Sequence, residues 1–284
     1  MIQTVKPDAS SLNLFGAVMI GYGVNCVVPR LGEVYRGMFI GKWEKLSRST
    51  MVGTVVVERI LDLASFAIAS LLSVYLYSGD LYNEIVWLKP SLILGFSIII
   101  FLTFFIVLLV KYEKKISGII LRFVVLINPK YSERVSEILE TLIDGFSTIK
   151  GWRNIFYIII LTTSIFLLYT WNTYFGFCML GMEKITDITF SMAWVFMTIS
   201  AYGILIPTPG GTGSYHIISI FVLSQLYSFS YEVSAAYAIL THFIQYVVFI
   251  LSTIGLILLI NNIRIRKGEK GENFLSVFNS TKID

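Results

Sequence analysis

Long apolar runs separated by short polar segments account for most of the chain. A helix that crosses a bilayer needs about 20 apolar residues, because the hydrocarbon core is about 30 Å thick and each helical residue rises about 1.5 Å. We therefore predict an all-α fold, a polytopic transmembrane helical bundle occupying residues 1–260 as a single domain. The runs predict about seven membrane helices, at Leu12–Val28, Met51–Ser78, Pro90–Val110, Asn154–Leu180, Ile188–Ile206, His216–Phe229 and Val233–Ile260.

The sixth run, His216–Phe229, is the shortest of the seven. It would form only about 21 Å of helix, which does not cross the hydrocarbon core unaided. Irregular backbone at membrane depth is tolerated only where protein or a water-filled space surrounds it. We therefore expect a half-helix or a re-entrant segment here, so that the bundle contains interrupted helices.

The segment from 111 to 153 has apolar residues at helical spacing instead of a continuous apolar run. Ser132–Lys150 and Ile116–Ile127 each place their apolar side chains on one helical face, and Asn128-Pro129 separates the two. We predict a cytoplasmic amphipathic helical hairpin, which either packs on the bundle or lies in the headgroup layer. Residues 261–284 form a short polar cytoplasmic tail, which we expect to be largely disordered.

The composition excludes several classes of protein. The chain is 56% hydrophobic and only 14% charged, whereas an average soluble domain is about 25% charged. An ordinary soluble enzyme, a disordered chain and a nucleic-acid binder with a basic stripe are therefore excluded. The two cysteines lie in apolar runs, which excludes a disulfide scaffold. His216 and His242 are too few and too far apart in the sequence for a histidine metal centre, so we predict no metal or cofactor.

The distribution of Lys and Arg predicts the orientation. Segments 29–50, 111–153 and 261–284 carry five, eight and five basic residues, and the segments between them carry one each. Basic segments stay on the cytoplasmic side. With seven crossings the C-terminus is then inside and the N-terminus outside.

Three ionisable residues lie within the second predicted helix, namely Glu58, Arg59 and Asp62. A charged side chain at the centre of a membrane helix costs about 2.5–3.5 kcal/mol on insertion scales, so residues kept there are functional candidates. Arg59 reaches Asp62 at the i, i+3 spacing, which leaves Glu58 without a partner on its own helix.

The preceding segment supplies further charges, because Asn25 is followed by Arg30, Glu33 and Arg36, which we place on one side of a helix. Three acids and three arginines then form a charge-balanced cluster, which is an allowed buried arrangement. Two interpretations stay open. The cluster is either an ion-paired clamp that only fixes helix packing, or a site where arginines hold an anionic headgroup through paired hydrogen bonds.

A second polar feature lies between the fifth and sixth runs, where prolines and glycines alternate with Thr and Ser. Prolines end a helix, and glycines allow positive φ and close backbone approach. The helix that follows begins near Ser214 and offers free N–H groups to an anion. A tight surface turn is the alternative, but interrupted helices at membrane depth favour a transporter-type site. The candidate residues are Pro207, Pro209, Gly210, Gly211, Gly213, Ser214 and His216.

The first run has a similar ending, since Gly21, Gly23 and Asn25 lead to Pro29 as Gly203 leads to Pro207. In the predicted topology both helices run from outside to inside. We therefore predict that their breaks meet in the cytoplasmic half of the bundle and line one cavity. His242 and Gln245, on the last helix, are expected to make a helix–helix hydrogen bond.

In this order and on these helices, the motifs at Pro29–Arg36, Glu58–Asp62 and Pro207–Gly213 resemble the flippase-like, lysylphosphatidylglycerol synthase transmembrane-region family. The resemblance covers nearly the whole chain. It implies an integral protein of the bacterial or archaeal cytoplasmic membrane with about eight spans. In the bifunctional synthases this region is linked to translocation of the aminoacylated lipid. Some stand-alone members are associated with export or modification of other lipids or lipid-linked sugars.

Two features depart from the family pattern. The family has a Glu after the last glycine, where this chain has His216, a group that titrates near neutral pH. The family also has a span before the first run, and one more span would place the N-terminus inside, so we expect an N-terminally shortened chain. The soluble synthase domain of the bifunctional members is not represented in residues 261–284, so aminoacyl transfer is not expected from this chain alone.

Three functions are consistent with these observations. The first is a flippase-like protein that binds or translocates an anionic phospholipid or lipid-linked headgroup, with Arg30, Arg36 and the Gly210–Ser214 segment holding phosphate. The second is an integral-membrane transferase on a lipid substrate, with Glu58 or Asp62 as base. The third is a non-catalytic partner in an envelope-lipid complex. The expected partners are a membrane lipid and either a lipid-modifying enzyme or further copies of the chain, and no nucleic acid.

Overall fold

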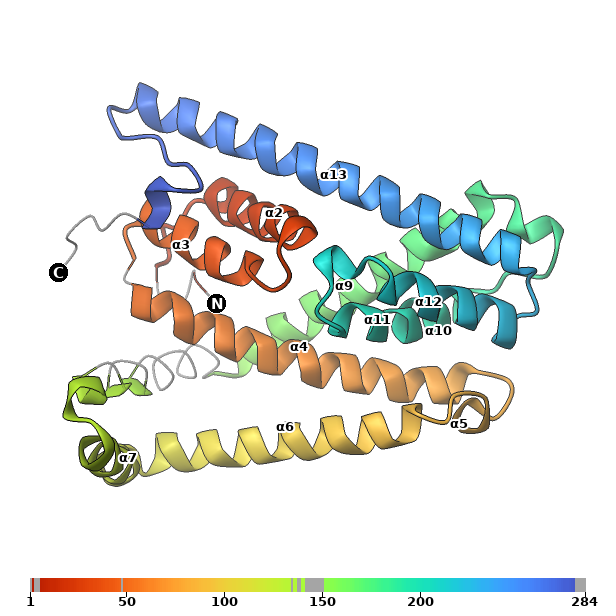
Figure 1. The fold of residues 1–284 in the computed structure, drawn as a ribbon. Coiled ribbons are helices and arrows are strands. Elements are labelled where there is room, and N and C mark those ends of the chain that lie inside the picture. The colour runs from red at the N-terminus through yellow and green to blue at the C-terminus, as the bar shows by residue number, and fades with distance from the viewer. Residues whose placement is uncertain are drawn as a thin grey trace.

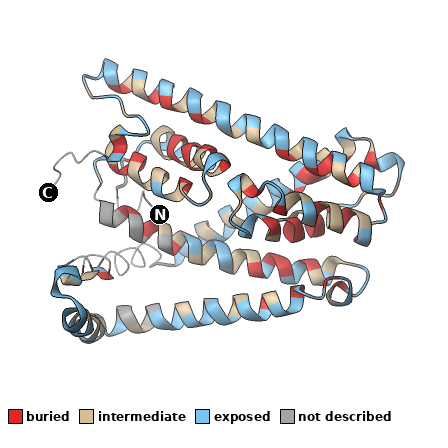
Figure 2. Cartoon of the chain, in the orientation of Figure 1, coloured by how far each residue is buried: buried red, intermediate tan, exposed pale blue. Residues whose placement is uncertain are grey.

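The computed structural model of the protein describes residues 2, 6–46, 48–133, 135–136, 139–140 and 151–278. These residues are mostly helical and include no strand, which confirms the all-α prediction. Four of the described helices are long and apolar enough to cross a membrane, namely α4 (Arg48–Leu76), α6 (Leu88–Lys111), α9 (Trp152–Met179) and α13 (Tyr231–Arg266). Their outward faces expose mainly apolar side chains, as lipid contact requires (Figure 2).

A helical hairpin precedes α4. Its legs are α2 (Ser11–Val27) and α3 (Gly32–Glu44), which pack on each other and turn at residues 28–31 near the middle of the molecule (Figure 1). Gly32 makes this close approach possible, because a Cβ there would collide with the carbonyl oxygen of Gly21. The outer ends of both legs lie together, since Lys6 Nζ is 3.3 Å from Glu44 Oε2.

The prediction that Leu12–Val28 crosses the membrane is therefore wrong, and so is the prediction that the two chain ends lie on opposite sides. Arg264 Nη1, near the end of α13, donates to the carbonyl of Trp43 near the end of α3 at 3.3 Å. The return leg α3 carries the chain back to the end where it began. This end holds residues 6–10, 44–46, 111–133 and 264–278, and we call it the basic end.

A second hairpin enters from the opposite end. Its first leg is α10 (Phe190–Ser200) with the short α11 (Tyr202–Leu205), and its second leg is α12 (Ser214–Phe221), which runs into the π-helical turn η4 (Val222–Leu226). Between them the tip contains η3 (Pro209–Gly211) and lies near the middle of the molecule (Figure 1). The prediction of a re-entrant sixth run is confirmed. The fifth run, Ile188–Ile206, is the other leg of the same hairpin and ends at its tip, so the prediction that this run crosses the membrane is wrong.

Each hairpin has its own apolar core. Around the first hairpin, Ile20, Phe39, Trp43 and Ile257 are among the buried residues. Around the second, a larger cluster joins α10 and η4 to α9, α13, α6 and α5 (Leu81–Glu84), with Phe177 and Phe196 fully buried. The polar residues singled out in the sequence lie between these two cores.

The basic end carries two further segments. The first arm of the predicted amphipathic hairpin is α7 (Glu113–Ile127), which follows directly on the end of α6 and is itself followed by η1 (Pro129–Tyr131) (Figure 1). The second arm lies mostly outside the described residues. The prediction of a disordered tail is wrong as far as Phe278, because η5 (Ser276–Phe278) packs on α3, where the Phe274 ring meets Tyr35 edge-on at 5.6 Å. The tail is polar on average, which predicts disorder, but its few aromatic side chains make apolar contacts that hold it on α3.

Candidate functional site between the hairpin tips

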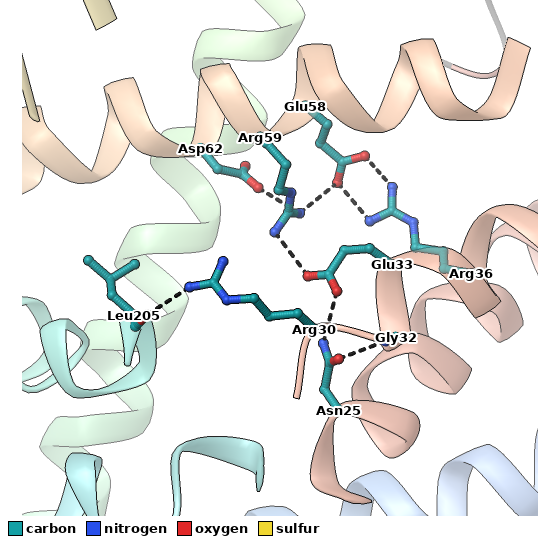
Figure 3. Close-up of polar contacts among 9 residues, drawn as sticks. All are labelled: Asn25, Arg30, Gly32, Glu33, Arg36, Glu58, Arg59, Asp62 and Leu205. Atoms are coloured by element: carbon teal, nitrogen blue, oxygen red, sulfur yellow. Dashed lines mark hydrogen bonds and ion pairs between the residues drawn. The ribbon is translucent and has the colours of Figure 1, made fainter. Parts of the chain in front are cut away.

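An ion pair between α3 and α4 forms the most enclosed part of the site (Figure 3). Arg36 donates to both carboxylate oxygens of Glu58, from Nη1 to Oε1 at 2.8 Å and from Nη2 to Oε2. The Arg36 side chain is 15% exposed and that of Glu58 is 29% exposed. Arg36 thus occupies both oxygens of Glu58 in a bidentate pair. The expectation that Glu58 has no partner on its own helix is wrong, since Arg59 also lies 3.6 Å from it.

Arg59 links three carboxylates. Its Nη2 lies 2.8 Å from Asp62 Oδ2, the i, i+3 pair predicted from the sequence, and 3.6 Å from Glu58 Oε1. Its Nη1 lies 3.6 Å from Glu33 Oε1. The Arg59 and Asp62 side chains are 46% and 55% exposed, so this side of the cluster is open to a polar guest.

The turn of the first hairpin positions Arg30. Asn25 Oδ1 accepts from the backbone N–H of Gly32 at 2.7 Å and so holds the turn, and Arg30 itself has φ of 60°. The predicted helical face of 30, 33 and 36 is therefore wrong for Arg30, which precedes α3. Its exposed guanidinium extends to the second hairpin, where Nη2 donates to the carbonyl of Leu205 at 2.7 Å (Figure 3).

These charges lie far from both ends of α4. Arg59 follows Arg48 by about 16 Å of helix and precedes Leu76 by about 26 Å. Three arginines and three carboxylates give the cluster a formal charge of zero, which lowers the cost of keeping ions at this depth. Among the described residues Arg30 has no carboxylate within 4.0 Å, and it is the one arginine of the cluster held by a backbone carbonyl alone.

The tip of the second hairpin is built from backbone groups. Gly210, Gly211 and Gly213 have φ of 56°, 83° and 89°, which glycine adopts without strain. The hydroxyl of Ser214 is turned inward, 2.7 Å from the Gly203 carbonyl oxygen. The predicted role of Ser214 as an anion ligand therefore has to compete with this internal hydrogen bond.

Helix α13 fastens this tip. His242 Nε2 lies 2.9 Å from the Gly210 carbonyl oxygen, so the predicted helix contact of His242 is made to the tip. The Tyr246 hydroxyl lies 2.6 Å from the carbonyl oxygen of Pro209 and 3.1 Å from that of Cys26. A hydroxyl has one proton to donate, so these two carbonyls compete for it. Tyr246 thus joins the tips of both hairpins to α13.

The two breaks in the sequence do come together, as predicted, but by another route. Arg30 reaches Leu205, and α2 contacts η3. Because the hairpins enter from opposite ends, the breaks meet near the middle of the molecule (Figure 1).

The predicted residues fall into two adjacent groups. One group is the ion cluster of Asn25, Arg30, Glu33, Arg36, Glu58, Arg59 and Asp62. The other is the backbone tip of Pro207, Pro209, Gly210, Gly211, Gly213 and Ser214, with His216 behind it.

His216 contacts His242 instead of the arginines. Their ring centroids are 4.7 Å apart, so the sequence-based separation of the two histidines does not hold in space. Among the described residues, however, no group of three His, Cys, Asp or Glu side chains is placed to hold a metal ion.

Three contributors to the region were not predicted. Leu205 contributes its backbone carbonyl, which a sequence does not distinguish from any other. Tyr246 has the same apolar sequence context as the other tyrosines in membrane helices. Glu44 is buried beside Asn13 and Lys6 and closes the outer end of the first hairpin, where the sequence indicates only a cytoplasmic segment over 29–50. A Glu among apolar residues such as Phe39, Ile40 and Trp43 was the available signal.

A family model described as the lysylphosphatidylglycerol synthase TM region matches residues 1–252. A UPF0104 membrane protein of Methanocaldococcus jannaschii is 24% identical over 286 aligned residues, which cover 95% of this chain and 81% of the relative. A UPF0104 membrane protein of Methanothermobacter thermautotrophicus is 27% identical over 260 residues, covering 86% and 74%. A second Methanocaldococcus jannaschii UPF0104 membrane protein is 34% identical over 106 residues, covering 35% and 45%. No solved structure matches the chain.

Proposed function

The chain belongs to the lysylphosphatidylglycerol synthase TM region family, and from this membership and the ion cluster between the hairpin tips we propose that it binds and translocates a lipid with an anionic headgroup. The headgroup phosphate, whether of a phospholipid or of a lipid-linked sugar, is held midway between the two ends of the bundle.

The observation that carries the proposal is the state of Arg30. Its guanidinium is exposed and has a backbone carbonyl as partner, with no carboxylate within 4.0 Å among the described residues. A charge placed this way at membrane depth is costly without a polar companion. A guanidinium has five N–H donors in a planar fork, so most of them are available to phosphate oxygens.

The remaining charges have different roles in this proposal. Arg36 and Glu58 pair through two hydrogen bonds and position α3 against α4. Arg59 and Asp62 are half exposed beside them, where Arg59 adds positive potential and Asp62 can contact a cationic part of a headgroup. The neutral total lets the site release its guest as well as bind it, since no large net charge attracts the phosphate.

The two other candidate functions are less well supported. A transferase would use Glu58 or Asp62 as base, but both oxygens of Glu58 accept from Arg36. A partner in an envelope-lipid complex, or self-association, would use a surface such as the exposed apolar residues Phe123 and Leu126 of α7. That surface equally fits a helix lying in the headgroup layer.

The test is transbilayer movement in proteoliposomes, with phosphatidylglycerol as the substrate and dithionite bleaching of a fluorescent headgroup as the readout. We expect Arg30→Gln to lower the initial rate about 10-fold or more, since a hydrogen bond to a charged group contributes about 1.5–3 kcal/mol. Arg30→Lys should be intermediate, because it keeps the charge and loses the fork.

Arg153→Gln is the matched control, since Arg153 is an exposed arginine at the start of α9, away from the cluster. It should leave the rate unchanged. Equal rates for the wild type and Arg30→Gln would contradict the proposal, and so would a lipid product formed without any movement of lipid across the bilayer.

A further inference from the structure

The two histidines of the chain come into contact behind the second hairpin tip. They are 26 positions apart in sequence, His216 in α12 and His242 in α13. Their rings are nearly perpendicular, with an interplanar angle of 85° and centroids 4.7 Å apart. Each ring is also bonded to the tip backbone, at Gly213 and Gly210 respectively. The two histidines therefore form a single site that is separate from the ion cluster.

The hydrogen bonds assign a proton to each ring. His216 Nδ1 accepts from the backbone N–H of Gly213 at 3.3 Å, so in the neutral ring the proton is on Nε2. That Nε2 is buried and has no hydrogen-bond partner. His242 Nε2 faces a carbonyl oxygen and must donate, which leaves its Nδ1 as a lone pair. Among the described residues no donor to this Nδ1 is found.

A proton added to either ring has different consequences. At Nδ1 of His242 it breaks no hydrogen bond. At Nδ1 of His216 it opposes the N–H of Gly213, because two donors then face each other, and it places a positive charge at the positive end of α12. Both rings cannot be charged together at this distance, so the pair holds one extra proton.

The surroundings provide no competing charge. Tyr215 of α12 stacks on His242 with centroids 5.2 Å apart, and Tyr246 of α13 lies 5.0 Å away. The second tip contributes the Thr212 hydroxyl and the Pro209 carbonyl, and the α2 tip contributes the Cys26 carbonyl, all of which contact the Tyr246 hydroxyl. No carboxylate lies within 4.0 Å of either ring among the described residues, and Arg30 is the charged side chain that reaches this tip.

We propose that His216 and His242 form a proton-binding site whose occupancy is coupled to opening of the second hairpin tip. The proton comes from hydronium on one side, forms an N–H bond at His242 and returns to water on the other side. When His216 takes it up, the first turn of α12 detaches from the Gly213 N–H and the tip is released. The transport consequence rests on the proposed function, and it makes a proton gradient the energy source.

Two isosteric variants test the coupling in the same proteoliposomes. In His216→Asn, the amide oxygen takes the place of Nδ1 and still accepts from Gly213. In His242→Gln, the amide N–H takes the place of Nε2 and still donates to Gly210. Neither side chain titrates. The readout is the initial rate of lipid movement with a pH gradient divided by the initial rate without one. Because both rates come from the same variant, differences in basal activity cancel.

We expect a ratio of at least about fivefold for the wild type, the lower end of measured couplings between sites, and a ratio of about one for both variants. A wild-type ratio of one overturns the inference and leaves the proposed function standing. Variants that keep the wild-type ratio also overturn it. Absence of lipid movement under every condition counts against the proposed function instead.

Proton binding itself is measured without transport, by nuclear magnetic resonance of two samples, one labelled with 15N-histidine and one with 15N-glycine. The histidine spectrum contains the signals of only two residues, and the variant that lacks one histidine assigns the signals of the other. We expect the pair to take up one proton, and the Gly213 amide to shift in the same transition because part of that proton occupies His216. Two independent titrations, or a Gly213 amide that does not move, would overturn the proposal.

Discussion

The two hairpins both place a polar turn at membrane depth, but they use different chemical groups to do so. Each brings a polar turn to the middle of the molecule, but the first does so with charged side chains and the second with backbone dipoles. Arg36 of the first hairpin is paired with Glu58 of α4. The second is held through the carbonyls of Pro209 and Gly210, which bond to α13.

This difference in bonding indicates which hairpin is rigid and which can move. A bidentate ion pair is directional and costly to break, because each partner is left as an uncompensated charge. Hydrogen bonds from hydroxyl and imidazole groups to carbonyls are weaker and can be exchanged for water. The first hairpin is therefore the rigid wall of the site, and the second is the part able to move.

The largest effect should come from removing the counter-ion of the first hairpin. Glu58→Gln leaves Arg36 partly buried without its carboxylate, and we expect the free energy of unfolding to fall by about 3 kcal/mol, the lower end for buried pairs because Glu58 is 29% exposed. The measurement is thermal unfolding in detergent. The double variant Arg36→Gln/Glu58→Gln should recover most of the loss, and no recovery would show that the pair is not the cause.

Close packing of the legs should give the next effect. Gly32→Ala places a methyl group against the Gly21 carbonyl and within 2.7 Å of the Asn25 amide. Because the obstacle is backbone, we expect a loss of about 2 kcal/mol. Gly95→Ala in α6 is the control, since a methyl group there meets no atom within 4 Å and should not destabilise the protein. Equal unfolding temperatures for both variants would contradict the packing of α2 on α3.

A smaller effect is expected at the second hairpin. Tyr246→Phe removes the hydroxyl shared by the carbonyls of Pro209 and Cys26, at a cost of about 1 kcal/mol. Tyr231→Phe, at an exposed position on the same helix, should change stability by less than about 0.5 kcal/mol. If Tyr246→Phe destabilises as strongly as Glu58→Gln, the contrast between the hairpins is wrong.

The long helices were predictable because their signal is local. The runs Met51–Ser78, Pro90–Val110, Asn154–Leu180 and Val233–Ile260 correspond to α4, α6, α9 and α13 within a few residues, except that α13 extends to Arg266. Lipid contact demands a continuous apolar stretch, which a single sequence displays. The re-entrant leg of the second hairpin was also predictable, since the run His216–Phe229 is too short to cross and follows a proline and glycine cluster. Its other leg, the run Ile188–Ile206, is long enough to suggest a crossing, and the hairpin as a whole was not predicted.

The first hairpin was missed because protein, not lipid, covers α3. This leg buries Phe39 and Trp43 between α2, α13 and the tail, and so it needs no apolar surface on every side. Its Arg and Lys residues therefore indicate a cytoplasmic segment between two membrane helices, although the helical face shared by Glu33 and Arg36 is predicted correctly. The ion cluster itself was predicted from its charged residues. Its link to Leu205 was not, because the hydrogen bond is to a backbone carbonyl, which the identity of the residue does not indicate.

The most direct test of the account is the side on which the first hairpin opens. In a variant lacking Cys26 and Cys178, single cysteines at Ser10, Lys45, Asp187 and Lys270 would be labelled with a membrane-impermeant thiol reagent in sealed, oriented vesicles. The account predicts that Ser10, Lys45 and Lys270 react from one side and Asp187 from the other, because α2 and α3 return to the basic end. If Ser10 reacts from the side of Asp187, α2 crosses the membrane and the meeting of two opposed hairpins is contradicted.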